Sequence, residues 1–508
     1  MTDPTASPSQ AERTGARRLV SGVFWNALGR GLPLLLALAL TPVLVHLMGL
    51  ERWGLFTLAL AMVGVFGVFD LGIGPALTRA LSERIEHGDR REASRLVGAA
   101  LAALGGLACL VAAVFWAILP WLVTRALNVP EALQAEALAA FRVLAVAAPL
   151  IVVNAALWGV LSAHQRFAAA NLATLPVAVM YYVGPVLVLL VWQSLVGVML
   201  ALVACRLANT LSYAWLVRRD LPGFGVGRLR DVLPLLRIGG WMTAGSLLNQ
   251  GLIYADRFLI GAVLTLAAVA HYATPLDLVL RMWILPVAVA QALLPAMAGA
   301  FRSDPTATAN LLRRGGLIVL ALTLPPCLLL AAEGDLLLRL WLGRDFAAEG
   351  GAVLRILGAG ILFSCMAYAP NVLLEAIGRP DVAAKFLLAQ LVVFLPLSAL
   401  LLWRFGIEGA AVAWALRCAA DFSGKLYFAQ RLYPAARMAA RGLVAPAIAA
   451  GVGLAFLLQF QHPGVMAALA AATLAAVLAL AWPLLDGDER ALLRRPWRAR
   501  QLLRGRPA

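Results

Sequence analysis

Charged side chains occur inside stretches of sequence that are otherwise apolar enough to cross a membrane. The basic ones are Arg30, Arg142, Arg206, Arg257, Arg281, Arg355, Arg417 and Lys425, and the acidic ones are Asp70, Asp256, Asp277, Glu375 and Asp421. A charge at the centre of a membrane helix costs at least about 2.5–3.5 kcal/mol, so we expect these groups to face one another or a water-filled cavity. Because the basic residues outnumber the acidic ones, the excess positive charge can hold an anionic group. Arginine suits that task, since its guanidinium binds phosphate oxygens bidentately and stays charged.

Two arginines stand apart because no acidic residue lies four positions away from them. Arg30 follows Asn26 by one helical turn, and Arg206 precedes Asn209 by three residues, so the members of each pair share a helix face. We predict that all four residues line a cationic binding cavity.

Other charges are spaced so that neighbours on one helix face can neutralise each other. Asp277 and Arg281 are four residues apart, and Arg417, Asp421 and Lys425 form a stripe with the same spacing. Such pairs either make membrane insertion tolerable or take part in binding and coupling. The binding candidates here are Arg281, Arg417 and Lys425, and the coupling or gating candidates are Asp277 and Asp421.

Three more charged residues are candidates for coupling or gating. Asp256 and Arg257 are adjacent near the expected outer end of a helix over 238–262, where a structural role is an equal alternative. Asp70 ends the second apolar run, where it could cap the following turn, pair with a cavity arginine or carry a coupling proton.

We expect the other polar residues of the apolar runs to have structural roles. Arg142, Arg355 and Glu375 lie near the ends of spans, where we expect long side chains to snorkel toward the membrane surface. The five cysteines fall in apolar runs without a paired spacing, so the sequence predicts no metal site and no cofactor. The motifs HExxH and GxSxG and the Walker lysine motif are missing, which favours a protein that is not an enzyme.

The composition shows which elements must position these residues. The chain has 508 residues, 62% of them hydrophobic and 13% charged, with a mean hydropathy of +0.86. A soluble domain is roughly half apolar and a quarter charged. The apolar runs are continuous over about 20 residues and lack the alternation of barrel strands, which predicts an all-α polytopic membrane protein. Fourteen transmembrane helices are predicted, over 20–46, 54–77, 96–123, 137–163, 167–192, 195–217, 238–262, 267–299, 314–332, 351–376, 384–403, 409–430, 442–460 and 465–485.

The net charge of +16 is carried almost entirely by arginine and is unevenly distributed. With the N-terminus in the cytoplasm, the fourteen helices place 29 of the 42 Lys and Arg residues in cytoplasmic segments and five in outer segments. This asymmetry is typical of the positive-inside rule and predicts two cytoplasmic termini. It also explains the basic charge without a nucleic-acid partner. The first apolar run is too long for a cleaved signal and is expected to remain as a helix.

The chain is expected to contain two six-helix lobes. An N-lobe over 20–217 and a C-lobe over 238–430 are separated by an amphipathic linker over 218–237, and a cytoplasmic tail over 1–19 precedes them. An extra helix pair over 442–485 and a basic cytoplasmic tail over 486–508 follow. Trp25 and Phe56 have the same 31-residue separation as Trp241 and Tyr272, which suggests a parallel repeat with the substrate site between the lobes.

Three segments carry a resemblance to a known family. Residues 22–59 (GVFWNALGRGLPLLLALALTPVLVHLMGLERWGLFTLA), residues 69–81 (FDLGIGPALTRAL) and the segment containing YADRFLIGAVL and AHYATPLDLVLRM resemble polysaccharide flippases of the multidrug/oligosaccharidyl-lipid/polysaccharide exporter superfamily. The resemblance covers roughly residues 18–430. It implies two bundles that form a V around a central cavity. It also implies alternating-access flipping, across the bacterial inner membrane, of an undecaprenyl-pyrophosphate-linked repeat unit for lipopolysaccharide or exopolysaccharide synthesis.

The resemblance also implies partners and leaves alternatives open. The partners are the lipid-linked oligosaccharide, membrane lipids, a coupling ion (H⁺ or Na⁺), and polymerase and export proteins of the pathway. A drug/cation antiporter of the superfamily would need a negative cavity, and a lipid II flippase is expected to have a Ser- and Arg-rich opening. A membrane glycosyltransferase or polymerase would need large outer loops, whereas the longest predicted one spans only 333–350 and lacks histidine.

Overall fold

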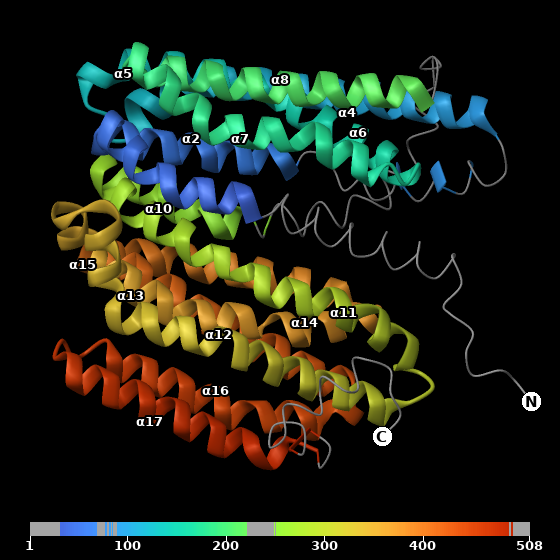
Figure 1. The fold of residues 1–508 in the computed structure, drawn as a ribbon, viewed down its shortest axis with the longest axis vertical. Helices are drawn as coiled ribbons and strands as arrows, with labels where there is room; N and C mark the ends of the chain where they lie inside the picture. The colour runs from blue at the N-terminus through green and yellow to red at the C-terminus, as the bar shows by residue number, and fades with distance from the viewer. Residues whose placement is uncertain are drawn as a thin grey trace, which may run out of the picture. The chain divides into compact units, whose positions relative to one another are not determined.

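The computed structural model describes residues 31–68, 89–220 and 250–486, with residues 77–78, 81–82, 84, 248 and 489–490. Within these residues all regular secondary structure is helical, as Figure 1 shows. By length and composition, 12 of the described helices are able to cross a membrane. The predicted all-α polytopic class is therefore confirmed.

The chain divides into two compact units, Met1–Ala270 and His271–Ala508. The helices of the first unit are Gly31–Met48, α2 (Leu50–Val68), α4 (Arg90–Trp121), the π-helix η1 (Leu122–Ala126), α5 (Glu131–Ala145), α6 (Ala147–Ala163), α7 (Phe167–Val191), α8 (Leu195–Asp220), a helix over 250–263 and the start of α10 (Leu266–Leu280). Buried Ala100 of α4, Ala156 of α6 and Tyr213 of α8 belong to one apolar cluster. Small residues in this cluster allow the three helices to approach closely.

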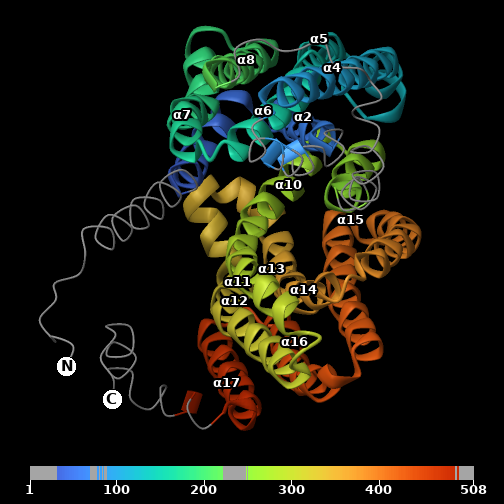
Figure 2. The same cartoon turned by 90° about the vertical axis from the view of Figure 1, so that its right-hand side faces the viewer.

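The second unit begins within α10 and ends beyond the last helix pair. Its other helices are η2 (Arg281–Trp283), α11 (Ile284–Ala300), α12 (Pro305–Leu342), α13 (Arg344–Met366), α14 (Tyr368–Ala376), α15 (Pro380–Leu432), η3 (Pro434–Ala436), α16 (Arg437–Leu457), α17 (Pro463–Ala481) and η4 (Trp482–Leu484). Helices α16 and α17 lie side by side in both views (Figures 1 and 2). They correspond to the predicted extra helix pair.

Each of the fourteen predicted segments overlaps a helix of the structure, although three of them, 20–46, 54–77 and 238–262, are only partly described. The 53 residues of α15 include Gly406 at φ 62° and ψ −149°, a conformation that interrupts the helix between two predicted spans. The number of membrane crossings and the cytoplasmic location of both termini stay predictions. The predicted tails and linker lie wholly or largely outside the described residues.

The boundary between the compact units follows residue 270 rather than the predicted linker. Asn128 donates from Nδ2 to the carbonyl oxygens of Ala262 and Leu264, at 3.0 and 2.9 Å. The Gln250 amide donates to the Gly64 carbonyl at 3.5 Å. These contacts hold residues 250–264 against the rest of the first unit. The lobes over 20–217 and 238–430 stay predictions.

Candidate functional site

Two predicted binding residues, Arg206 and Asn209, line one pocket of the first unit. The pocket has a volume of about 330 Å³ and lies mainly between α7 and α8. Its other lining residues are Pro33, Thr174, Val177, Ala178, Tyr181, Tyr182 and Cys205. Volumes of roughly 300–1,000 Å³ are typical of small-ligand sites, so this pocket can hold a compact chemical group.

A tight helical hairpin positions this pocket, because only three residues separate the end of α7 from the start of α8. Near the turn, the Leu195 N–H donates to Oε1 of Glu136 at 2.7 Å, while Oε2 accepts from Arg52 Nε at 2.9 Å. Farther from the turn, the hydroxyl oxygens of Thr174 and Tyr213 are hydrogen-bonded at 2.5 Å. The two helices are therefore fixed at both ends of the pocket.

The charge in this pocket belongs to Arg206. Its guanidinium carbon lies 5.5 Å from the centroid of the Tyr181 ring, and within the described residues it forms no ion pair with a carboxylate. The buried Oδ1 of Asn209 has no hydrogen-bond partner in the same part of the chain. A side-chain amide can turn to present either its oxygen or its NH₂ group. The pocket thus offers a permanent cation and an adaptable amide to an anion or to a hydroxylated ligand.

Two members of the predicted stripe on α15 neutralise each other. Lys425 Nζ lies 2.8 Å from Asp421 Oδ2, and both side chains are only 12% exposed. Nε2 of Gln390 donates to the other carboxylate oxygen at 2.8 Å. The structure therefore brings Asp421 and Lys425 together as a buried pair, with Gln390 as a partner that sequence reasoning missed.

Arg417 occupies a different environment from the rest of its stripe. Its guanidinium carbon lies 5.4 Å from the centroid of the Phe394 ring and 5.8 Å from that of Trp414. Among the described residues it has no carboxylate partner, and its Nε is buried without a hydrogen bond. Like Arg206 in the other unit, Arg417 rests on aromatic rings.

Asp277 and Arg281 do not pair with each other among the described residues, and Asp277 interacts with another group. The α-helix α10 ends at Leu280, and Arg281 begins the 3₁₀ helix η2, where the repeat tightens to about three residues per turn. Trp283 in η2 donates from Nε1 to Ser364 Oγ at 3.0 Å. Arg281 is exposed, whereas Asp277 is half-buried.

The other predicted site residues are either deeply buried or outside the described residues. Asp256 and Arg257 are each 1% exposed, and the Arg257 guanidinium lies 5.1 Å from the centroid of the Tyr254 ring. This burial supports the structural alternative, and a coupling or gating role for the two residues stays a prediction. The residues outside the described part of the chain are Asn26, Arg30 and Asp70.

The expectation that Arg355 snorkels to the membrane surface is wrong. Arg355 is 6% exposed and donates to the carbonyl oxygens of Ala331 at 2.8 Å, Leu457 at 2.8 Å and Phe460 at 3.0 Å. Helix α12 leaves helical geometry at Glu333, and α16 ends at Leu457, so both places leave carbonyl groups without intrahelical partners. Arg355 satisfies these groups and joins α12, α13 and α16.

Sequence reasoning also missed Tyr181, Tyr182 and Cys205 in the Arg206 pocket. The signal was present, because residues equally far from a tight turn face each other in an antiparallel hairpin. That rule places Thr174 opposite Tyr213 and Tyr181 opposite Arg206, as the structure shows. In the part of the chain that the structure describes, no cluster of His, Cys, Asp and Glu is suited to a metal ion.

Comparison of the amino-acid sequence with known proteins gives a family match and a related protein. The family model described as "Polysaccharide biosynthesis protein" matches residues 19–301. A Shigella flexneri protein named "Putative O-antigen transporter" is 24% identical over 413 residues, which are 79% of this chain and 96% of the relative.

Solved structures of transporters share the fold. The lipid II flippase MurJ in an inward closed conformation superposes with a TM-score of 0.69 at 11% identity, covering 90% of this chain and 98% of MurJ. An inward-facing MATE multidrug transporter of the MOP superfamily gives a TM-score of 0.68 at 16% identity, covering 80% and 96%. At these identities the similarity shows the fold alone. With its family match extending over more than half of its length, this multi-span membrane protein belongs to the polysaccharide biosynthesis protein family.

Proposed function

We propose that the protein flips an undecaprenyl-pyrophosphate-linked oligosaccharide repeat unit from the inner to the outer leaflet of the bacterial inner membrane by alternating access. The family match and the name of the Shigella relative support transport of a polysaccharide precursor. The fold shared with a lipid II flippase supports a lipid-linked substrate. The observation that carries the substrate class is the pocket in which Arg206 lies without a carboxylate partner among the described residues.

The contact between Arg206 and the Tyr181 ring is weak enough for an anionic ligand to replace it. A cation–π contact contributes roughly 0.5–2 kcal/mol. Hydrogen bonds to charged groups contribute about 1.5–3 kcal/mol each, and a guanidinium can make two of them to a phosphate. A pyrophosphate in the pocket would therefore attract the guanidinium away from the Tyr181 ring. A carboxylate partner in place of the ring would oppose that exchange.

The same argument ranks the other proposed binding residues. Arg417 also rests on aromatic rings and is the corresponding cation of the second unit. Lys425 is already neutralised by Asp421, which makes it a weaker binding candidate and leaves Asp421 as a coupling candidate. Arg281 is exposed and keeps its proposed binding role.

The alternatives differ in what they require of the pocket. A drug/cation antiporter binds positively charged compounds, which Arg206 would repel. A lipid II flippase also binds a pyrophosphate, so this pocket suits it equally well, and the family match favours the polysaccharide precursor. A glycosyltransferase or polymerase is a weaker candidate because the relatives are named as transporters.

Transport in proteoliposomes tests the proposal. We expect Arg206→Ala to abolish most flipping of an undecaprenyl-pyrophosphate oligosaccharide, and Arg206→Lys to retain part of it, because lysine keeps the charge but lacks the bidentate fork. Arg142→Ala is the matched control, since Arg142 also lies over a ring, that of Trp116, but outside the pocket. Normal flipping by a fully inserted Arg206→Ala protein would overturn the proposal.

A further inference from the structure

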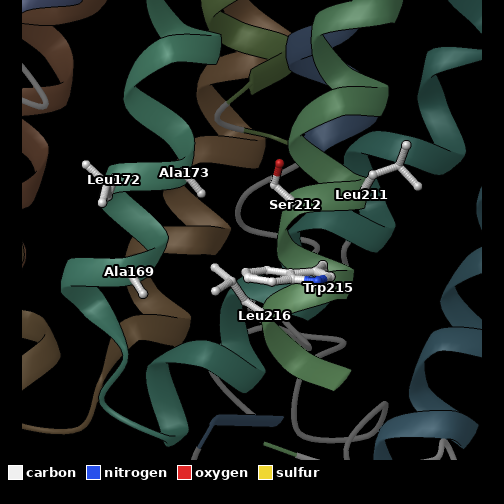
Figure 3. A pocket seen from close by; sticks show the side chains of 7 residues that line it. All are labelled: Ala169, Leu172, Ala173, Leu211, Ser212, Trp215 and Leu216. Carbon is white, nitrogen blue, oxygen red and sulfur yellow. The ribbon is translucent and has the colours of Figure 1, made fainter. Parts of the chain in front are cut away.

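A second pocket lies between the same two helices as the Arg206 pocket. It has a volume of about 510 Å³ and lies within the candidate spans Ala169–Val191 and Leu195–Arg219. Figure 3 shows Leu216 and the Trp215 ring of α8 between the helices, with Ala169 and Ala173 on the α7 side. This α7–α8 groove is lined by Ala169, Leu172, Ala173, Leu211, Ser212, Trp215 and Leu216.

The α7–α8 groove offers a mainly apolar surface. It is open because Ala169 and Ala173 have the smallest side chains that α7 could place opposite Ser212 and Leu216. The Ser212 hydroxyl donates within its own helix, to the Ala208 carbonyl at 2.8 Å, so it requires no ligand. Trp215 is 59% exposed, and the guanidinium carbon of Arg219 lies 4.9 Å from the centroid of its ring, which leaves the other side of the ring to the groove. A hydrocarbon chain is the chemical class that fits such a lining.

The groove lies next to the Arg206 pocket along both helices. On α7 its lining ends at Ala173, next to Thr174 of the Arg206 pocket. On α8, Ser212 follows Arg206 by six residues, which is about 9 Å along a helix axis. A cationic, amide-lined pocket is thus followed within two helical turns by an apolar one. A cationic pocket beside an apolar groove is the arrangement that fits a phosphate joined covalently to a hydrocarbon chain.

We propose that the α7–α8 groove binds the isoprenoid chain of the lipid whose pyrophosphate binds at Arg206. The inference rests on the proposed function, because the chain is placed by its covalent link to the pyrophosphate. Because the chain moves into the groove from lipid that is equally apolar, the groove contributes through van der Waals packing against the chain, which the head group alone does not supply. The first unit therefore recognises both parts of the carrier lipid, and chain length becomes a determinant of affinity.

Binding of two ligands to the full-length protein in lipid nanodiscs tests this inference. The ligands are undecaprenyl pyrophosphate and inorganic pyrophosphate, which has no hydrocarbon chain. Ser212→Phe fills the groove, and Leu207→Phe is the control, since Leu207 is 44% exposed on the same helix and lines neither pocket. We expect Ser212→Phe to weaken undecaprenyl pyrophosphate binding about tenfold, the effect of losing about ten atom contacts between chain and groove at roughly 0.1–0.2 kcal/mol each. Binding of inorganic pyrophosphate should be unchanged, and Leu207→Phe should affect neither ligand.

The outcomes separate this inference from the proposed function. Equal undecaprenyl pyrophosphate affinity in wild type and Ser212→Phe would overturn the groove assignment alone. Unchanged binding of both ligands by Arg206→Ala would overturn the pyrophosphate site itself.

A photo-crosslinking experiment provides a second test that does not fill the groove. Benzoylphenylalanine replaces Trp215, and the control is the same replacement at Leu200, which is 47% exposed on α8. Photo-crosslinking of undecaprenyl pyrophosphate at 215 and not at 200 is expected, whereas crosslinking only of phospholipid at 215 would contradict the assignment.

Discussion

The guanidinium of Arg206 lies over the ring of Tyr181, with 5.5 Å between its central carbon and the ring centroid. The two residues come from opposite helices of one hairpin and line the same pocket. An aromatic ring stabilises a cation in an apolar environment without neutralising it. The arginine therefore keeps its charge available for an anionic ligand, which is the physical basis of the function proposed here.

The contact between Arg206 and Tyr181 predicts a measurable coupling energy. Tyr181→Leu removes the aromatic face and should lower the free energy of unfolding, whereas Tyr181→Phe retains the face, loses only the hydroxyl group and should have a smaller effect. In a double-mutant cycle with Arg206→Met, we expect a coupling of about 0.5–2 kcal/mol. Unfolding in detergent provides the measurement, and additive effects of the two substitutions would contradict the contact.

The buried pair of Asp421 and Lys425 predicts a large effect of removing one partner. Lys425→Met leaves a carboxylate in an apolar environment and should reduce stability by about 3–5 kcal/mol. The double variant Asp421→Asn, Lys425→Met should regain most of that loss. Lys385→Met is the matched control, because Lys385 and Asp381 have the same spacing but side-chain exposures of 69% and 41%. Lys385→Met should change the free energy of unfolding by no more than about 1 kcal/mol. Equal losses of stability in Lys385→Met and Lys425→Met would contradict the conclusion that burial makes the Asp421–Lys425 pair more sensitive.

Close packing of α2 against the start of α10 predicts opposite effects of two glycine substitutions. A Cβ at Gly54 would collide with the Leu266 carbonyl group, whereas a Cβ at Gly67 would meet no described atom within 4 Å. Gly54→Ala should therefore destabilise the first unit, while Gly67→Ala should stabilise it by roughly 0.5–1 kcal/mol through helix propensity. Melting temperatures measure both effects, and a harmless Gly54→Ala would show that the helices are less closely packed.

The ion pairs at the end of the last helix pair predict a pH dependence. Asp486 accepts from Arg313 at 2.7 Å and from Arg314 at 2.9 Å, and hydrogen bonding from Arg314 lowers the pKa of its carboxyl group below the ordinary 3.8. A lowered folded-state pKa contributes stability that is fully present above 3.8 and is lost as pH falls through the folded-state value. The difference in melting temperature between wild type and Asp486→Asn should therefore shrink on acidification. A difference that is independent of pH would exclude this carboxylate as its source.

The fold class was predictable because membrane helices are specified by local sequence. Long apolar runs fix the helices, and Gly406 interrupts α15 where a turn was expected between 384–403 and 409–430. Contacts between distant segments were not predictable in this way. Asn128 is hydrogen-bonded to the carbonyl groups of Ala262 and Leu264, and neither spacing nor hydropathy indicates that contact.

The candidate site was predictable on one helix and not across helices. Helical periodicity places Arg206 and Asn209 on the same face, and both line the pocket. The same rule did not indicate that Arg281 begins a 3₁₀ turn or that Arg417 contacts the ring of Phe394 on another segment. Periodicity describes the face that a helix presents, whereas the partner of that face depends on tertiary packing.

The central claim is that the pocket around Arg206 binds a lipid-linked pyrophosphate, and its native Cys205 allows a direct measurement. Cys205 lines the pocket, and a protein retaining only this cysteine requires replacement of Cys109, Cys327, Cys365 and Cys418. The rate of Cys205 modification by a water-soluble thiol reagent is measured with and without undecaprenyl pyrophosphate. Our account predicts that the lipid slows modification in a saturable manner, and that Arg206→Ala raises the concentration required for half protection. Modification at the same rate with and without saturating lipid would contradict it.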